Sequence, residues 1–368
     1  MREIRVGMIG SGFIANVHLD ALKHIHGARA VAIASIDEKS RKKLARKHRI
    51  PKEYGNWKDI LKDKEVDVVI IGLPNYLHAS VTIEAAKHGK HVICEKPLAL
   101  TLEEADRMIE ACEKAGVILG YAEELCFVPK FVHAKEIADS GAIGNVFFVK
   151  QCEEHAGPYS EWFFKAHTAG GGILMDMGCH SIEYCRYVMN KKKVKSVYAE
   201  MGTYLHKDIT KLEDHVIITL EFEDGTRAFC ESSWARKGGM ISFTEIYGTE
   251  GVVYANLLQE GMGLKVYSEK GIPPNKKETK GWTHPDWEWN WQNGYPQEDE
   301  HFYECIRTGT KPRESGEDGR VVLEIMLAAY WSAATGQKVK LPFVPPDDLK
   351  YPVDLWLHPK KWAKKIKA

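Results

Sequence analysis

The feature that most constrains the fold is a glycine-rich turn between the first expected strand and the first expected helix. In VGMIGSGFIANVH, Gly10, Gly12 and Ala15 form the pattern GxGxxA. The first glycine permits a tight turn, the second lets backbone approach a pyrophosphate, and the alanine allows close helix–strand packing. The helix N-terminus offers free N–H groups to phosphates. The turn, with Phe13 and Ile14 inside it, predicts a dinucleotide site; the alternative is a packing turn.

Strands and helices alternate over the first part of the chain, as in parallel βαβ units. The near-continuous apolar run DVVIIG is typical of a strand buried on both faces, and Thr101 with Glu104 forms a capping box. The expected strands are 4–10, 28–35, 67–72, 91–94 and 117–122, and the expected helices are 13–26, 38–48, 76–89 and 101–116. We therefore predict an α/β fold with an N-terminal Rossmann doubly wound parallel sheet.

Beyond residue 122 the pattern changes to longer strands with fewer helices. Asp224-Gly225 between two of the strands is a hairpin signal. The expected strands are 145–154, 194–204, 215–222, 226–235 and 241–248, and the expected helices are 127–141, 297–307 and 317–335. This part predicts an α+β domain with a large, mostly antiparallel open sheet. We place the domains at 1–122 and 123–368, with a C-terminal segment that packs back on the first.

Composition excludes several classes of partner. Lys+Arg and Asp+Glu number 51 each, so the formal net charge is zero, which disfavours nucleic acid or an anionic membrane as the main partner. No apolar run approaches the roughly 18 residues of a membrane helix. The sequence opens directly into a strand, so we expect a cytoplasmic protein. The eight cysteines form no CxxC pair, which makes a zinc site of the usual spacing improbable, and we expect no metal.

The residues that would read the cofactor's ribose lie at the end of the second strand. Ser35 occupies the position where NAD enzymes often carry an acid, and Asp37 follows two residues later. A serine can bind either a 2′-hydroxyl or a 2′-phosphate. NADP sites usually add an arginine immediately afterwards, where this chain has Ile36. The cofactor is therefore NAD or NADP, with a preference for NAD because the expected phosphate clamp is missing.

A second loop follows the strand at 67–72. It contains Leu73, Pro74, Asn75 and His78. Loops at the carboxyl edge of a parallel sheet lie where ligands bind. These four residues are therefore candidates for cofactor contacts.

Two further motifs carry polar residues suited to catalysis. Glu95-Lys96-Pro97 ends the strand HVIC, where a lysine could reach both a dinucleotide and its substrate. In GGGILMDMGCHSIEYCRYVM, Asp176 and His180 are four residues apart, on one face of a helix. Taken alone, the first motif favours an exposed lysine and the second a structural Asp–His pair.

Together these motifs resemble the Gfo/Idh/MocA family of glucose–fructose oxidoreductases and myo-inositol dehydrogenases. The resemblance covers the whole chain and rests on GSGFIA, PNYLH, EKP and the Asp–His helix. It implies that Lys96, Asp176 and His180 form the active site and that Glu95 and Asn75 hold the nicotinamide side of the cofactor. It also favours a homodimer or homotetramer.

The chain departs from the family pattern at two places, and the resemblance also bears on one peptide bond. The chain differs from the inositol dehydrogenase pattern at Ser35, which bears on the cofactor, and at Glu123-Glu124, which bears on the substrate. The Lys96–Pro97 bond is a candidate for the cis form, which would fix the direction of the lysine.

The three implied active-site residues suit the oxidation of an alcohol. A base whose pKa is near the working pH is needed to take the hydroxyl proton, and His180 qualifies. Lys96 as a cation would stabilise developing alkoxide charge. Asp176 could orient the histidine or bind a substrate hydroxyl. The cofactor supplies the hydride chemistry.

Other residues bear on the substrate. Glu123, His155, Tyr159 and Trp162 are polar or aromatic and fall near the expected pocket, where they could bind a sugar. The segment 281–296 holds four tryptophans. Because tryptophan is enriched at interfaces, we favour an interface or lid for this segment over a direct substrate contact.

We therefore expect an NAD(P)-dependent dehydrogenase acting on a secondary hydroxyl of a sugar, anhydrosugar or cyclic polyol. Two alternatives remain at this point. One is an NAD-dependent glycosidase of the same fold, in which the redox cycle is internal. The other is a non-catalytic sensor of sugar and dinucleotide. The identity of the sugar lies beyond the sequence.

Overall fold

Two β-sheets organise the chain, one in each of two units. The computed structural model describes residues 3–238, 240–257, 264–273, 279–283 and 294–366. The first unit comprises Met1–Glu124 and Tyr295–Val321, and the second comprises Leu125–Gly294 and Val322–Ala368. A stretch of the C-terminal third thus belongs to the first unit. The domain boundaries at 1–122 and 123–368 stay predictions.

The first unit contains a six-stranded parallel sheet in the order β3-β2-β1-β4-β5-β6. Its strands are β1 (Ile4–Ile9), β2 (Ala28–Ala34), β3 (Lys52–Tyr54), β4 (Val68–Ile71), β5 (His91–Glu95) and β6 (Leu119–Ala122). This is the order of the doubly wound dinucleotide fold, and it reverses between β1 and β4. The predicted fold class is confirmed, and the reversal places the loops after β1 and β4 side by side.

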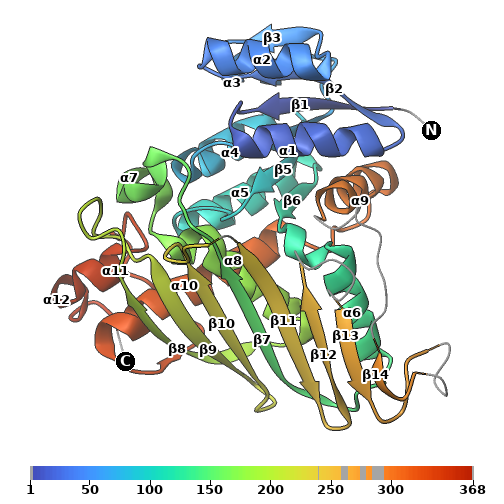
Figure 1. Cartoon of the computed structure of the whole chain (residues 1–368). Coiled ribbons are helices and arrows are strands. Elements are labelled where there is room, and N and C mark those ends of the chain that lie inside the picture. The colour runs from blue at the N-terminus through green and yellow to red at the C-terminus, as the bar shows by residue number, and fades with distance from the viewer. Residues whose placement is uncertain (1–2, 239, 258–263, 274–278, 284–293, 367–368) are drawn as a thin grey trace. The chain divides into compact units, whose positions relative to one another are not determined.

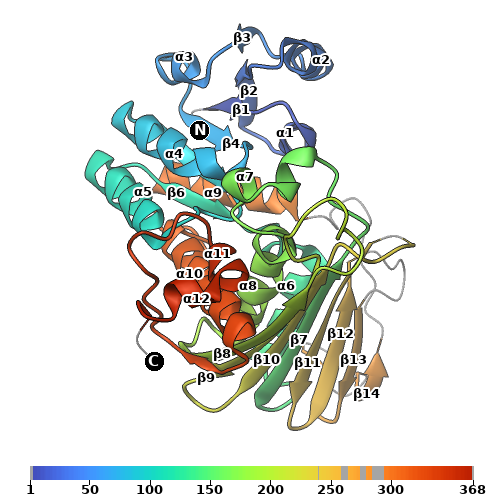
Figure 2. The same ribbon diagram turned by 90° about the vertical axis from the view of Figure 1, so that its left-hand side faces the viewer.

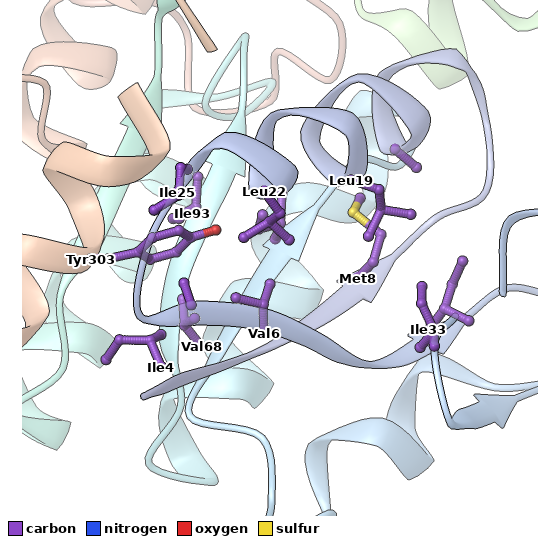
Figure 3. Close-up of a cluster of buried hydrophobic side chains, with 14 of the residues drawn as sticks. Ile4, Val6, Met8, Leu19, Leu22, Ile25, Ile33, Val68, Ile93 and Tyr303 are labelled. Carbon is purple, nitrogen blue, oxygen red and sulfur yellow. The ribbon is translucent and has the colours of Figure 1, made fainter. Parts of the chain in front are cut away.

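Helices cover both faces of this sheet. They are α1 (Phe13–Ala21), η1 (Leu22–His24), α2 (Glu38–His48), α3 (Trp57–Leu61), η2 (Asn75–Leu77), α4 (His78–Lys87), α5 (Leu102–Ala115) and α9 (Tyr295–Thr308). Figure 3 shows the core between β-strands and α1, where Tyr303 of α9 lies beside Ile25 and Ile93, and Met8 and Leu19 lie together further along the cluster. Helix α9 therefore completes the core of the first unit from a distant part of the sequence.

Local sequence signals explain where several elements start and end. All four residues of β4 are fully buried, as expected for a strand covered on both faces. The capping pair at α5 is confirmed, because Thr101 Oγ1 accepts the Glu104 N–H at 3.1 Å. The Glu104 carboxylate accepts the N–H of Leu100 rather than that of Thr101.

The second unit contains a nine-stranded sheet in the order β14-β13-β12-β11-β7-β10-β9-β8-β15. Its strands are β7 (Val146–Glu154), β8 (Val194–Gly202), β9 (His215–Phe222), β10 (Arg227–Ser233), β11 (Ile241–Gly248), β12 (Gly251–Asn256), β13 (Leu264–Ser268), β14 (Gly281–Thr283) and β15 (Val339–Lys340). Neighbours are antiparallel except β7 and β10, which are parallel. The hairpin at Asp224-Gly225 is confirmed, and Gly225 has φ +85°.

The helices of the second unit gather on one face of this sheet. Helices α6 and α8 pack on it, with α10 behind β8 (Figures 1 and 2). The remaining elements of the chain are η3 (Glu124–Cys126), α6 (Pro129–Asp139), η4 (Glu161–Phe164), α7 (Ala166–Ala169), η5 (Leu174–Gly178), α8 (Cys179–Val188), α10 (Gly316–Thr335), α11 (Asp354–Leu357) and α12 (Pro359–Trp362). The first residues of η3 and α10 belong to the first unit. Within the described residues, no helix covers the opposite face.

Some sequence expectations differ from the structure in detail. The helix predicted over 13–26 is shorter, because α1 ends at Ala21 and continues as the 3₁₀ turn η1. Strands β12 to β15 lacked a clear enough pattern to be predicted. The tryptophan-rich segment 281–296 lies largely outside the described residues. Among the described helices, none is long and apolar enough to cross a membrane.

Candidate active site

The glycine turn after β1 is shaped by the loop after β4. Gly10 has φ +120°, and a Cβ there would lie 2.1 Å from the carbonyl oxygen of Gly72. A Cβ on Gly12, by contrast, would have no atom within 4 Å. Gly12 is the N-cap of α1 and no side chain caps the helix. Ala15 is fully buried, whereas Phe13 is 81% exposed.

This geometry fits the predicted pyrophosphate site. Open space at Gly12 and a helix N-terminus without a side-chain cap would let an anion reach main-chain N–H groups. Ile14 packs against Gly72, since a Cβ added there would meet its Cγ2 at 2.9 Å.

The polar groups after β2 form a local network around Ser35. Its Oγ accepts a hydrogen bond from Ser11 at 2.8 Å, and its carbonyl accepts one from Arg41 at 2.6 Å. Arg41 also pairs with Glu53 at 3.3 Å. The Asp37 carboxylate caps α2 by accepting the Ser40 N–H and hydroxyl. Those hydrogen bonds lower the pKa of Asp37.

The loop after β4 is tied to the segment after β5 through a buried histidine. His78 Nδ1 lies 2.8 Å from the carbonyl oxygen of Pro97, and Nε2 lies 2.8 Å from that of Leu73. Burial lowers the pKa of His78, and neither carbonyl carries a charge that would reverse the effect. Asn75 is also buried, and the Lys96–Pro97 bond is cis, as anticipated.

Glu95 connects His18 with the backbone of Lys96 in the first unit. Its Oε1 is 2.9 Å from His18 Nε2, and its Oε2 accepts the Lys96 N–H at 3.1 Å. The other ring nitrogen of His18 is 3.2 Å from Asp299 Oδ1. The side chain of Lys96 is partly exposed, while His18, Glu95 and Asp299 are buried.

More carboxylates surround this group. Glu298 is fully buried, and burial together with the charges of Glu124, Asp299 and Glu95 raises its pKa well above the usual value. Glu123, predicted to bind substrate, is also fully buried at the end of β6 and adds to the same effect.

In the second unit, Asp176 lies in a π-helical turn, η5, that runs directly into α8. Its Oδ2 accepts a hydrogen bond from Trp234 Nε1 at 2.8 Å and lies 3.9 Å from His155 Nε2. Single π turns inside helices are frequent at functional sites. His180 is buried one turn later in α8.

The predicted aromatic residues lie in the segment between β7 and α7. Tyr159 is 80% exposed and stacks on His155 with ring centroids 5.2 Å apart. Trp162 stacks on Phe163 at 3.8 Å. His155 therefore links Tyr159 to Asp176. The Phe163 ring of the second stack lies 6.2 Å from Trp234, the indole that donates to Asp176.

The backbone that leads into η5 is held by a buried glutamate. Glu213 Oε1 accepts the N–H of Gly172 at 2.9 Å, the N–H of Leu174 at 3.1 Å and the hydroxyl of Tyr330 at 2.6 Å. A Cβ on Gly172 would lie 2.0 Å from the Glu213 carbonyl oxygen. The glycine run thus permits a close approach by the protein's own chain.

Several of these residues were not predicted. His18, Asp299, Trp234 and Glu213 fall on elements whose pairing is long-range; His18 and Asp299 are 281 residues apart. Only His18 stood near a recognised motif, one helical turn after Ala15. Neither periodicity nor spacing indicates such distant partners.

Comparison with known proteins identifies the family. Residues 4–123 match the profile of an oxidoreductase family with an NAD-binding Rossmann fold, and residues 131–254 match the GFO/IDH/MocA C-terminal domain. The chain belongs to the Gfo/Idh/MocA family. It is therefore an oxidoreductase with an NAD-binding domain, and the resemblance noted in its motifs is confirmed.

Relatives match over nearly their full length. Myo-inositol 2-dehydrogenase of Thermotoga maritima is 29% identical over 340 residues, which cover 92% of this chain and 98% of the relative. GenD2 from gentamicin A biosynthesis, solved with NAD, is 31% identical with a TM-score of 0.82 and coverages of 93% and 97%. Levoglucosan dehydrogenase, solved with NADH and levoglucosan, is 26% identical with a TM-score of 0.81 and coverages of 93% and 100%.

The Glu213 contacts lead to a pH prediction. Burial raises the pKa of Glu213 to about 7, although the hydrogen bonds it accepts oppose the shift. Because the folded pKa lies above the unfolded value, stability should fall as pH rises from about 4.5 to about 7, by up to roughly 3 kcal/mol. Glu213→Gln should flatten this slope in urea unfolding measured from pH 5 to pH 8.

A control and a second variant sharpen that test. Exposed Glu161→Gln should keep the wild-type dependence of stability on pH. Tyr330→Phe removes a donor to the Glu213 carboxylate, which should raise the pKa of Glu213 further and move the loss of stability to higher pH. An unchanged slope in Glu213→Gln would show that this carboxyl does not titrate in the window.

Proposed function

We propose that the protein oxidises a secondary hydroxyl of a sugar, anhydrosugar or cyclic polyol, with a nicotinamide dinucleotide as hydride acceptor. The observation that carries the proposal is the presence of Lys96, Asp176 and His180 in a chain matched over both family domains. The relatives named for inositol and levoglucosan support the class of substrate.

The proposed roles follow from the chemistry of each group. Lys96 carries a cationic side chain that can stabilise an alkoxide, and Glu95 accepts its main-chain N–H. His180 takes the hydroxyl proton, since a neutral imidazole is a base suited to neutral pH. The bound nicotinamide supplies the hydride chemistry.

Asp176 is proposed to orient the substrate or His180. Its hydrogen bond from Trp234 fixes one carboxylate oxygen, and the fully buried indole prevents that oxygen from turning away. His155 lies close enough to the same oxygen to share a substrate hydroxyl with it. With Tyr159 stacked on His155, the group presents an imidazole, a carboxylate and an aromatic face, which suits a sugar ring.

The NAD-dependent glycosidase and the non-catalytic sensor are alternatives, and the products formed by the protein distinguish them from a dehydrogenase. A dehydrogenase forms reduced cofactor in proportion to the sugar oxidised. A glycosidase with an internal redox cycle would cleave a chromogenic glycoside without net reduction of the cofactor. A sensor would bind both ligands and turn over neither.

The first test of the proposal replaces the lysine. Lys96→Ala should lower kcat/KM by roughly 10²–10³-fold, the usual effect of removing one group that stabilises an oxyanion. The assay is NADH formation, followed by absorbance, with a panel of cyclic polyols and anhydrosugars. His180→Asn should lower kcat and remove the pivotal ionisation from the pH–rate profile.

Exposed Lys87, on α4 of the same unit, provides the matched control, and Lys87→Ala should leave the rates unchanged. Thermal melts establish that each variant is folded. Full activity in folded Lys96→Ala would exclude the proposed role of the lysine.

We further propose that the cofactor is NAD rather than NADP. Ile36, where NADP sites often carry an arginine, is 90% exposed and offers no charge. The nearby guanidinium of Arg41 is already engaged by Glu53 and by the Ser35 carbonyl. A 2′-phosphate at Ser35 would therefore meet a cation whose charge is partly neutralised.

Glu53→Gln should therefore shift the cofactor preference towards NADP. Removing the carboxylate frees Arg41, and a charge-assisted bond to phosphate of about 1.5 kcal/mol corresponds to roughly a tenfold gain in kcat/KM for NADP. Steady-state kinetics with both cofactors measure the ratio. The same gain in the double variant Glu53→Gln/Arg41→Ala would rule out Arg41 as its cause.

We also propose that the protein is a homo-oligomer formed through the open face of the nine-stranded sheet. Phe148, Phe229, Phe243 and Tyr247 are half-exposed on this face, and Lys150 Nζ lies 5.1 Å from the Phe243 ring centroid. Aromatic surfaces of this kind are enriched in interfaces.

Light scattering tests the oligomer directly. The wild type should have a mass of at least two chains, and Phe243→Glu should shift it towards one chain. Ile209→Glu alters an apolar side chain that is 63% exposed in a loop, and it should leave the mass unchanged. A monomeric wild type at micromolar concentration would refute the proposal.

A further inference from the structure

A buried chain of polar groups leads from α9 to the lysine segment of the first unit. His18, on α1, is fully buried with its Nδ1 3.2 Å from Asp299 Oδ1 and its Nε2 2.9 Å from Glu95 Oε1. The edge of Tyr295 closes over the ring, with centroids 5.5 Å apart. The imidazole is therefore held on both sides by carboxylates and has little freedom to turn.

The charges make His18 a cation in this setting. Burial lowers its pKa, but Asp299 and Glu95 outweigh burial and raise the pKa to about 10. Both ring nitrogens must carry protons to donate to two carboxylates at once. Burial raises the pKa of Asp299, and the His18 charge opposes that shift. Glu298 interacts with both carboxylates, Tyr303 interacts with Asp299, and Glu123 and Glu124 interact with Glu298.

A third buried carboxyl, Glu298, provides independent evidence that this cluster needs the positive charge of His18. It is fully buried, and neither carboxylate oxygen has a hydrogen-bond partner among the described residues. Burial, followed by the charges of Glu124, Asp299 and Glu95, raises its pKa well above the usual value, so a further anion beside Glu95 and Asp299 is disfavoured. His18 is thus the positive group that balances Glu95 and Asp299.

The path continues from Glu95 to the lysine. While Glu95 Oε1 faces His18, Glu95 Oε2 accepts the Lys96 N–H at 3.1 Å. A carboxylate held at one oxygen has a fixed plane, and that plane sets where the second oxygen meets the backbone. The orientation of the Lys96 peptide therefore depends on His18, which is 77 residues before Glu95 in the chain.

We propose that His18 is a positioning residue that holds Glu95, and through it the backbone of Lys96, in the arrangement used for the reaction. His18 acts through Glu95 and is not proposed to touch a reacting group. The hold of His18 on Glu95 and on the Lys96 backbone does not depend on the proposed function, whereas the effect of His18 on turnover rests on the proposed function of Lys96.

A bound cation is a weaker explanation for the same cluster. Ligand atoms of His18, Glu298 and Asp299 lie within 4.8 Å of one another, as a metal site would need. However, a metal binds the lone pair of a neutral imidazole. In this structure both nitrogens of His18 face carboxylates at hydrogen-bonding distance, so neither is directed to a shared ion.

Two amide variants of His18 separate positioning from packing. The amide nitrogen of Asn occupies roughly the place of Nδ1, and that of Gln roughly the place of Nε2. His18→Asn should keep a donor to Asp299 but lose the donor to Glu95, whereas His18→Gln should keep the donor to Glu95. We expect kcat to fall by up to about 100-fold in His18→Asn, with a smaller change in KM, and to recover largely in His18→Gln.

A readout without cofactor or substrate follows the Lys96 amide directly. In protein labelled with ¹⁵N-lysine, the Lys96 N–H resonance is assigned by its loss in Lys96→Ala. It should move in His18→Asn and stay close to the wild-type position in His18→Gln. Exposed His26→Gln is the matched control and should change neither the resonance nor kcat.

The possible outcomes separate the two ideas. A Lys96 resonance that does not move in His18→Asn, or equal effects of Asn and Gln, would overturn the positioning role. A resonance that moves with unchanged kcat would support positioning and count against the proposed function of Lys96. If His18→Asn moves the Lys96 resonance and lowers kcat, and His18→Gln restores both readouts, the positioning role of His18 and the proposed function of Lys96 are both supported.

A pH measurement provides a second test if His18→Asn does not fold. Because the folded pKa lies above the unfolded one, His18 contributes stability that is complete below about pH 6.5 and is lost as pH approaches 10. In Asp299→Asn, which removes one counter-charge, the imidazole resonance should titrate at lower pH than in the wild type. Titration of wild-type His18 near pH 6.5 would overturn the proposal.

Discussion

Buried carboxylates that accept main-chain N–H groups hold the candidate site residues in both units. In the first unit Glu95 accepts the N–H of Lys96, and in the second Glu213 accepts those of Gly172 and Leu174. A carboxylate is strongly hydrated in water, so burying one is unfavourable unless charge or hydrogen bonds compensate. The conformation of each segment therefore depends on how its carboxylate is stabilised.

The two units stabilise their carboxylates differently. Glu95 is paired with the His18 cation, so an ion pair sets its geometry. Glu213 has only neutral donors, and burial raises its pKa to about 7. Asp214, its neighbour, accepts the N–H groups of Tyr204, Leu205 and His206, and these outweigh burial and lower its pKa. An ion pair thus fixes the segment at Lys96, whereas hydrogen bonds to a carboxyl whose pKa is about 7 fix the segment at Gly172 and Leu174.

Short-range patterns explain what could be predicted from the sequence. The turn at Gly10, the cap at Thr101 and the hairpin at Gly225 each depend on neighbouring residues, and the structure contains all three. Strand alternation indicated the parallel sheet for the same reason. The partners of the site residues were not predictable, because the contacts of His18 with Asp299 and of Asp176 with Trp234 join distant elements. The parallel pairing of β7 with β10 and the π turn at Asp176 likewise depend on packing rather than on local propensity.

Helix α9 shows how such long-range contacts join core and site in the first unit. Phe302 and Tyr303 belong to the buried cluster that includes residues of β1 and α1, and Asp299, one turn earlier, meets His18. Apolar burial and charge pairing therefore act on the same helix. Burying two aromatic side chains contributes several kcal/mol, which is comparable to the penalty of burying ions. The core that α9 completes thus provides the stability that allows Asp299 and His18 to remain buried, and with them the carboxylate that holds Lys96.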